Sequence, residues 1–155
     1  MNNNLIELSS ITQSFTKPDG NIQKILDQIS FNIKEGEILA ILGKSGCGKS
    51  TLLRIIAGLI KPSRGKVKYN HEATDKTFGI SMIFQSFALF PWLTVLENVE
   101  LGLEAMDVPR IERRKKALEA IDLIGLDGFE SAMPRELSGG MKQRVGFARA
   151  LVVEP

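Results

Sequence analysis

The sequence has a single cysteine, no long apolar run and almost no net charge, and each of these features excludes a class of protein. It contains one cysteine, Cys47, so no disulfide can form within the chain, and this usage suits a reducing cytosol. No apolar run approaches the roughly 18 residues that a membrane-spanning helix needs, so we expect the chain to act on a membrane only from outside the lipid. The net charge is only +2, which gives no electrostatic reason to expect a nucleic-acid partner.

The remaining composition is that of an ordinary globular protein. Its 155 residues, 43% of them hydrophobic and 25% charged, suit one domain with a real core. The first residues, MNNNLIELSS, lack the basic and then apolar pattern of a signal peptide. Neither internal repeats nor a low-complexity linker interrupts the chain. We therefore expect a single folded domain and no export signal.

The most informative stretch is GKSGCGKST at residues 43–51. It fits the pattern G-x-x-x-x-G-K-[ST] of a phosphate-binding loop. The apolar run EILAIL at 37–42 predicts a buried strand before the loop. Apolar residues at helical spacing predict a helix over 49–60 behind it, ended by Pro62. This context favours a nucleotide site over the alternative, a glycine-rich turn that merely precedes a helix.

The residue types in this loop suit the binding of phosphate. Its glycines let the backbone bring N–H groups close to a ligand, and at a helix N-terminus such groups bind anions. Lys49 would supply a positive charge to the β- and γ-phosphates, and Ser50 a hydroxyl for Mg²⁺. We expect Cys47 to fill space there rather than to react. The predicted nucleotide-binding residues of the loop are Gly43, Lys44, Ser45, Gly46, Cys47, Gly48, Lys49, Ser50 and Thr51.

Before Gln85 the pattern is rich in strands. Alternating apolar residues predict a first strand at Ile6 and Leu8 and a second over 28–34, with turns at 17–21 and 61–65. Two further strands are predicted at 67–69 and 77–84, the latter ending at Gln85. His71 lies in a polar stretch that we expect to be a solvated loop.

After Gln85 the pattern is helical. Thr94 and Glu97 form a capping-box motif that predicts a helix over 96–106. Pro109 predicts the start of a second helix, which Gly125 ends. The stretch LSGGMKQR at 137–144 opens a third. The apolar faces predicted for the second and third helices are Ile111, Leu118, Ile121 and Ile124, and Val145, Ala148 and Val152.

A phosphate loop, a glutamine that closes a strand, and LSGG before a helix, in this order, resemble the nucleotide-binding domain of ATP-binding cassette (ABC) transporters. The stretches LFPWLTVLENVELGLE and PRELSGGMKQR are most similar to ATPase subunits of bacterial nitrate/sulfonate/taurine-type importers. The resemblance implies an α/β fold, a P-loop NTPase (RecA-like) core with an N-terminal antiparallel β subdomain and an inserted helical subdomain. The implied limits are 1–85 for the β subdomain and core, 86–137 for the helical subdomain and 138–155 for the signature helix.

The resemblance also implies roles for single residues, with ATP and Mg²⁺ as cofactors. Phe15 lies where the family places an aromatic residue that stacks on adenine, although the usual residue is tyrosine and a core position is the alternative. Gln85 would join Ser50 around Mg²⁺, and Lys49 and Gln85 would act in catalysis. The signature residues implied to contact the γ-phosphate held by a second copy are Ser138, Gly139 and Gly140.

The partners implied are a second copy, paired head to tail with ATP between the two, and membrane permease subunits. A substrate-binding protein would act indirectly, no nucleic acid is expected, and the protein would lie at the cytoplasmic face of the plasma membrane. Phe87, Phe90 and Trp92 would then form either ordinary core or a groove that receives a short permease helix. The family continues past Pro155 into the Walker B strand, the catalytic glutamate and the switch histidine, so we expect a longer parent protein. His71 cannot serve as that histidine, because it precedes Gln85.

The leading prediction is an ATP-hydrolysing subunit that drives an importer. One alternative is a soluble ABC ATPase that acts on ribosomes or DNA, but the short interval from Gln85 to Leu137 carries no sustained heptads. The other is a module that binds nucleotide without cleaving it. The transported solute is not predicted, because the permease and the binding protein select it.

Overall fold

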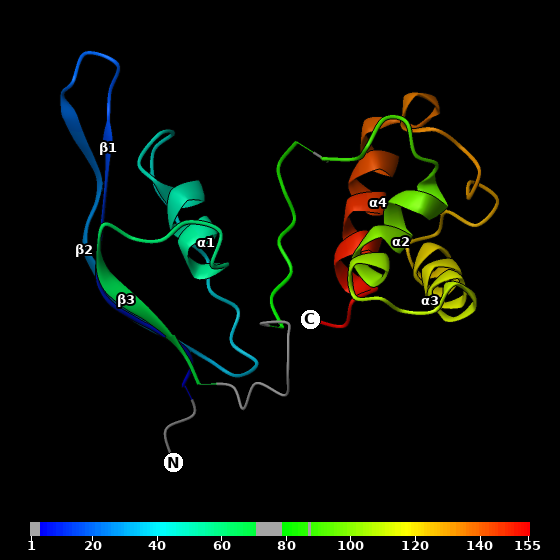
Figure 1. Cartoon of the computed structure of the whole chain (residues 1–155), viewed down its shortest axis with the longest axis horizontal. Coiled ribbons are helices and arrows are strands. Elements are labelled where there is room, and N and C mark those ends of the chain that lie inside the picture. Colours follow the sequence, from blue (N-terminus) through cyan, green and yellow to red (C-terminus); the bar gives the residue numbers. More distant parts are fainter. Residues whose placement is uncertain (1–3, 71–78, 87) are drawn as a thin grey trace. The chain divides into compact units, whose positions relative to one another are not determined.

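The computed structural model describes residues 4–70, 79–86 and 88–155. The chain divides into two bodies, Met1–Lys76 and Thr77–Pro155, whose elements are labelled in Figure 1. The loop predicted around His71 lies outside the described residues, as does Phe87.

The first body contains an antiparallel sheet of three strands in the order β2-β1-β3. The strands are β1 (Asn4–Thr16), β2 (Ile22–Lys34) and β3 (Arg64–Tyr69). The turn between β1 and β2 is closed by two backbone bonds, from the Lys17 N–H to the Asn21 carbonyl and from the Gly20 N–H to the Lys17 carbonyl. The strands predicted at Ile6 and Leu8, over 28–34 and at 67–69 are thus confirmed, together with the turn at 17–21.

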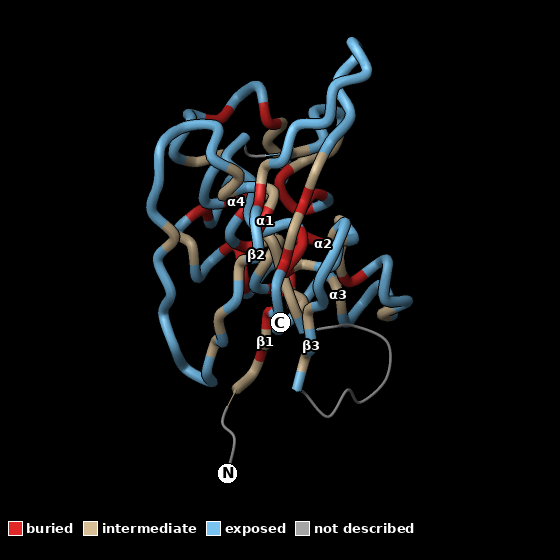
Figure 2. The backbone as a smooth tube through the Cα atoms, turned by 90° about the vertical axis from the view of Figure 1, so that its left-hand side faces the viewer, coloured by how far each residue is buried: buried red, intermediate tan, exposed pale blue. Residues whose placement is uncertain are grey.

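The buried apolar residues of this body come from β1, from Leu26 of β2 and from one helix. Helix α1 (Lys49–Ile56) buries Leu52, Ile55 and Ile56. The Tyr69 hydroxyl donates a hydrogen bond of 2.8 Å to the Ile56 carbonyl, which ties β3 to the end of α1. Buried residues recur along β1, whereas β2 is exposed over most of its length (Figure 2). The phosphate loop therefore enters a helix that is anchored to the sheet.

Helix α1 ends earlier than the sequence predicts. The predicted end at residue 60 is wrong, because Ala57 is already the C-cap and Gly58 takes a left-handed backbone with φ 72°. Glycine adopts this conformation at no steric cost, so a helix commonly ends there. Leu59, which the helical pattern included, is 59% exposed.

The buried strand predicted at 37–42 is wrong for the described structure. These residues form no strand, and the side chains of Ile38 and Leu42 are 97% and 90% exposed. A strand forms only when a neighbour accepts and donates its backbone hydrogen bonds, and the described sheet pairs β1 with β2 and β3 alone. Residues 79–84 of the strand predicted over 77–84 are likewise irregular, and 77–78 lie outside the described residues.

The second body is helical. Its α-helices are α2 (Val95–Ala105), α3 (Arg110–Leu123) and α4 (Gly139–Leu151), with a short 3₁₀ helix, η1 (Pro134–Glu136), before α4. Each of the three α-helices contacts the other two. Their shared core includes Val99, Leu103, Ile121 and Val145. The three predicted helices are confirmed, as are the Thr94–Glu97 capping box and the inward side of α4.

The apolar face predicted for α3 is partly wrong. Ile111 and Leu118 are 89% and 40% exposed, whereas Ala117, Ala120 and Ile121 are buried. Residues three and four apart share one side of a helix, so Ala117, Ile121 and Ile124 lie on one stripe. At about 100° per residue, Leu118 and Ile111 lie about 60° and 80° around the helix from Ile121, in the direction away from Ala117. The two alanines allow close packing, and together with Ile121 they define the buried side.

Candidate nucleotide-binding site

The loop over residues 43–48 enters α1 through a glycine that no other residue can easily replace. Gly48 is the N-cap of α1, with φ 100° and ψ 5°. A Cβ atom at this position would lie 2.8 Å from Cγ2 of Ile25 and 2.8 Å from Cδ2 of Leu26. Both the backbone conformation and the space at residue 48 therefore demand glycine. By contrast, Gly46 has φ 78°, and a Cβ there would meet no atom within 4 Å.

The N-terminus of α1 is open to an anion. No side chain caps it, and its first turn contains no acidic residue. The first N–H groups of a helix have no partner within the helix, and the helix dipole places partial positive charge beside them. An acceptor with negative charge, such as a phosphate oxygen, suits these donors.

The Lys49 ammonium lies over the loop. Its Nζ donates hydrogen bonds of 2.8 Å to the Gly43 carbonyl and 2.9 Å to the Lys44 carbonyl, and lies 3.9 Å from Sγ of Cys47. These contacts hold a positive charge against the glycine loop that leads into α1. Ser50, in the first turn of α1, is exposed, so its hydroxyl is accessible to a ligand. The loop thus combines backbone donors, a cation and a hydroxyl, which together fit a nucleotide phosphate with Mg²⁺.

Cys47 packs against the first glycine of the loop. A Cβ at Gly43 would lie only 2.7 Å from the Cys47 Sγ, so the glycine makes room for the thiol. The Cys47 residue is nevertheless exposed. The close contact agrees with the space-filling role expected from the sequence.

Phe15 lies near the end of β1, in the same body as the phosphate loop. It pairs in register with Gln23 of β2, and it is 43% exposed. The alternative interpretation of Phe15 as an ordinary core residue is therefore wrong. The exposed ring is available for contact with a ligand, and its stacking on adenine stays a prediction.

The other predicted site residues belong to the second body. Gln85 is exposed at a bend, ahead of the helices. Ser138 is the N-cap of α4, and its hydroxyl oxygen accepts a hydrogen bond of 3.3 Å from the Met141 N–H. Ser138, Gly139 and Gly140 are all exposed, so this helix N-terminus faces solvent within its body. The phosphate loop and the LSGG segment are thus two separate, exposed helix N-termini.

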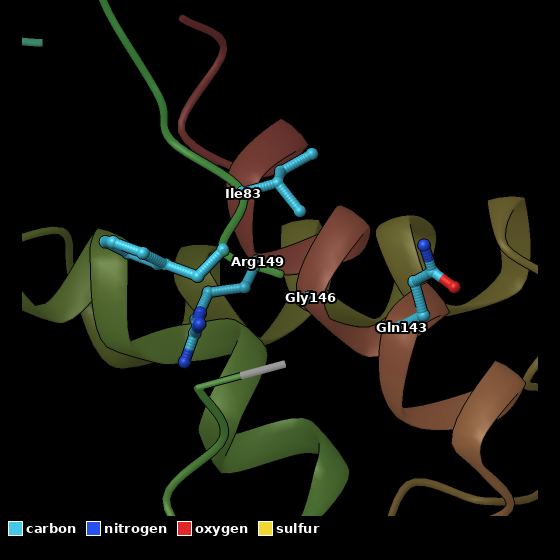
Figure 3. Close-up of a pocket in the computed structure, with 5 residues that line it drawn as sticks. Ile83, Gln143, Gly146 and Arg149 are labelled. Carbon is cyan, nitrogen blue, oxygen red and sulfur yellow. The ribbon is translucent and has the colours of Figure 1, made fainter. Parts of the chain in front are cut away.

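A hollow in the second body holds none of the predicted site residues. It is lined by Ile83 and Phe84, from the segment before Gln85, and by Gln143, Gly146 and Arg149 of α4 (Figure 3). Arg149 donates a hydrogen bond of 2.7 Å from Nη1 to the Ala88 carbonyl, and burial lowers the pKa of its guanidinium. The sequence analysis did not predict this hollow. The signal for it was that residues 143, 146 and 149 lie three apart, and so on one side of α4.

Two aromatic residues that follow Gln85, Phe90 and Trp92, are exposed rather than buried. Trp92 is 67% exposed and Phe90 42% exposed. Their rings pack edge to face, with centroids 5.3 Å apart and an interplanar angle of 61°. The interpretation of these two residues as core is therefore wrong. Phe87 lies outside the described residues.

Among the residues that the structure describes, no helix has the length and apolar character needed to cross a bilayer.

Comparison with known proteins gives consistent results. The sequence model of the family described as "ABC transporter" matches residues 26–155. The taurine import ATP-binding protein TauB of Rhizobium johnstonii is 43% identical over 97% of this chain and 58% of its own length. The Fe(3+) ions import ATP-binding protein FbpC of Escherichia coli K12 is 40% identical over 98% of this chain and 43% of its own length. An uncharacterized ABC transporter ATP-binding protein of Methanocaldococcus jannaschii is 45% identical, with coverages of 97% and 56%. The chain spans about half the length of the curated relatives it matches.

Solved structures give the same result. A dimeric ATP-binding cassette in a post-hydrolysis state with bound ADP and Pi has a TM-score of 0.81 and 38% identity. The match covers 97% of this chain and 70% of that one. A dimeric bacterial ABC transporter cassette has a TM-score of 0.81 and 40% identity, with the same coverages. The predicted α/β fold of an ABC-type P-loop ATPase is thereby confirmed, and the match over residues 26–155 shows that the chain belongs to the ABC transporter family.

Proposed function

We propose that the protein binds and hydrolyses ATP as the ATP-binding subunit of an ABC importer. The observation that carries the proposal is the phosphate loop. Gly48 fits its position only as glycine, the N-terminus of α1 is uncapped, and the Lys49 ammonium lies over the loop carbonyls. These features build an anion site of the kind that a nucleotide phosphate occupies.

Different residues of this chain would bind the phosphates, the metal and the base of Mg·ATP. Lys49 would exchange its bonds to the loop carbonyls for bonds to phosphate oxygens, and Ser50 would offer its hydroxyl to the metal. Gln85 would offer its amide oxygen to the same ion, and the exposed ring of Phe15 would stack on the base. When bound, Mg·ATP supplies the phosphoanhydride bond whose cleavage drives the transport cycle.

We also propose that two copies pair head to tail. Ser138 already accepts the Met141 N–H, so its hydroxyl hydrogen is still available to donate to a phosphate oxygen. With the first N–H groups of α4, this donor suits the γ-phosphate held by the phosphate loop of the other copy. Support comes from the two solved relatives, both of which are dimers.

The proposed second partner is a membrane permease, which would hold the protein at the cytoplasmic face of the plasma membrane. The exposed pair of Phe90 and Trp92 supports this partner, because an apolar patch of this kind suits a short helix of another protein. A substrate-binding protein would act through the permease. In this proposal the β subdomain and core occupy 1–85, the helical subdomain 86–137 and the signature helix 138–155.

For the solute, the narrower proposal is a nitrate, sulfonate or taurine-type substrate. A taurine import relative at 43% identity supports it. Relatives named for glycine betaine and for Fe(3+) have 46% and 40% identity, so overall similarity favours import without selecting the solute.

The test is a substitution that blocks the pairing of copies but leaves the phosphate loop untouched. In the full-length protein, Ser138→Arg should abolish phosphate release from Mg·ATP, because its side chain would fill the site of the partner's γ-phosphate. ATP binding to the monomer should change little. Ser131→Arg is the matched control, since it adds the same charge at another exposed serine of the same body. Wild-type turnover in Ser138→Arg would contradict the proposed pairing.

A further inference from the structure

One buried polar residue of the second body has no role in the proposed nucleotide site. Asn98, in α2, is 0% exposed, and its neighbours Val95 and Val99 belong to the helical core. Burying an amide costs free energy unless its donors and acceptor are bonded. A buried asparagine among apolar residues therefore indicates that the amide holds something specific.

The Asn98 amide is bonded entirely to the segment that precedes α2. Its Oδ1 accepts the Phe90 N–H at 2.8 Å. Its Nδ2 donates to three carbonyls, those of Phe90 at 3.2 Å, Leu93 at 3.0 Å and Thr94 at 2.9 Å. The side chain thus bonds both polar backbone groups of Phe90 and the carbonyls that close the segment at its other end.

These bonds fix the backbone that presents the aromatic pair. Asn98 bonds Phe90 directly, and Trp92 lies between Phe90 and the bonded carbonyls of Leu93 and Thr94. The Leu93 N–H also bonds the Phe90 carbonyl at 3.2 Å. Trp92 is 67% exposed, so packing against its own body does little to set its direction. The orientation of the pair depends on the backbone of residues 90–94, and that backbone is held by Asn98.

We propose that Asn98 is a positioning residue, which holds residues 90–94 in the conformation that presents Phe90 and Trp92 to a partner. The partner is an apolar helix of a membrane permease, and this part rests on the proposed function. A surface that is already ordered loses less conformational entropy on binding, so the fixed segment raises affinity without itself touching the partner.

The chemistry demands asparagine. Aspartate is nearly the same in shape and keeps the acceptor for the Phe90 N–H, but it has no N–H to donate. Its charge would also lie among three carbonyl oxygens, which repel it. Asn98→Asp should therefore loosen the segment at the Phe90 and Leu93 carbonyls while changing very little of the volume of the core; the Thr94 carbonyl keeps its 2.9 Å bond from the backbone N–H of residue 98.

The first measurement is hydrogen–deuterium exchange of the full-length protein, followed by mass spectrometry. In Asn98→Asp, the peptide that covers residues 90–94 should exchange about tenfold faster or more, because buried bonds to its backbone are lost. Val99→Ala is the matched control, since it removes a neighbouring buried side chain of the same helix that makes no bond to the segment. If Asn98→Asp does not fold, Asn98→Ser, with one donor and one acceptor on a shorter chain, gives the same comparison. Equal exchange in this peptide for the Asn98 variant and Val99→Ala would overturn the proposal.

The second measurement is affinity for the permease encoded with the protein, embedded in nanodiscs. Asn98→Asp should bind about tenfold more weakly than wild type, with Val99→Ala within about twofold and ATP affinity unchanged in both. Wild-type affinity in a variant with a loosened segment would overturn the positioning role. If even the wild-type protein does not bind the nanodiscs, the proposed partner is wrong, and the exchange experiment still decides whether Asn98 holds the segment.

Discussion

Replacing Gly48 by alanine tests whether the phosphate loop packs against β2 with a left-handed backbone at residue 48. Two costs arise at this position. The backbone has φ 100°, which L-residues rarely adopt, and the new Cβ would lie 2.8 Å from Cγ2 of Ile25 and 3.2 Å from its carbonyl oxygen. Neither atom moves easily, since Ile25 is branched at Cβ and lies within β2.

The two costs can be separated by a second substitution in the same loop. Gly46 has φ 78° but open space around its Cβ position, so Gly46→Ala carries the backbone cost alone. A left-handed backbone costs a non-glycine residue roughly 1–2 kcal/mol. Overpacking adds about 1–3 kcal/mol. We therefore expect Gly46→Ala to lose about 1–2 kcal/mol of stability and Gly48→Ala about 2–5 kcal/mol.

Urea unfolding of the full-length protein without nucleotide measures both losses. The unfolding midpoint should fall further for Gly48→Ala than for Gly46→Ala, with the same slope against urea in both variants. Equal losses of stability in the two variants would mean that residue 48 does not pack against β2, which would contradict this loop geometry.

Two further predictions concern the second body. Trp92→Ala should weaken binding to permease nanodiscs, while ATP affinity and melting temperature stay near wild type because Trp92 is 67% exposed. An equal loss of permease binding, ATP affinity and thermal stability would refute the role of Trp92 as a contact surface. The Thr94 N–H and hydroxyl both donate hydrogen bonds to the Glu97 carboxylate, and these bonds hold the pKa of Glu97 below its usual value. The contribution of Glu97 to stability is therefore complete above its unfolded-state pKa and is lost as pH falls through its folded-state pKa. The difference in unfolding free energy between wild type and Glu97→Ala should therefore be larger at about pH 6 than at about pH 3, and a difference that grows on acidification would contradict this linkage.

Features that depend on residues close in sequence were predicted well. The capping box needs only Thr94 and Glu97, three positions apart, and both of its bonds are present. The end of α3 follows from Gly125, whose φ of 65° stops the helix. For α1, the sequence predicts a stop at Pro62, but the helix ends before Gly58, whose left-handed backbone already terminates it.

Features that depend on distant residues were predicted less well. The run at 37–42 is as apolar as a buried strand, yet a strand needs a neighbour, and nothing within the run says whether one is present. The exposure of Phe90 and Trp92 could not be predicted from the sequence either, since aromatic residues are more often buried than exposed. A usable signal was present in Asn98, an amide between Val95 and Val99 in the predicted helix, directly after the aromatic stretch.

The most direct test of the central claim is titration of the full-length protein with Mg·ATP, comparing wild type with Lys49→Ala. Loss of the ammonium removes charge-assisted bonds to phosphate, each worth about 1.5–3 kcal/mol, so affinity should fall about 10- to 150-fold or more. Lys61→Ala, which removes the same charge from an exposed residue between α1 and β3 of the same body, should bind like wild type. Unchanged ATP affinity in Lys49→Ala, or an equal loss in Lys61→Ala, would contradict a nucleotide site built on this loop.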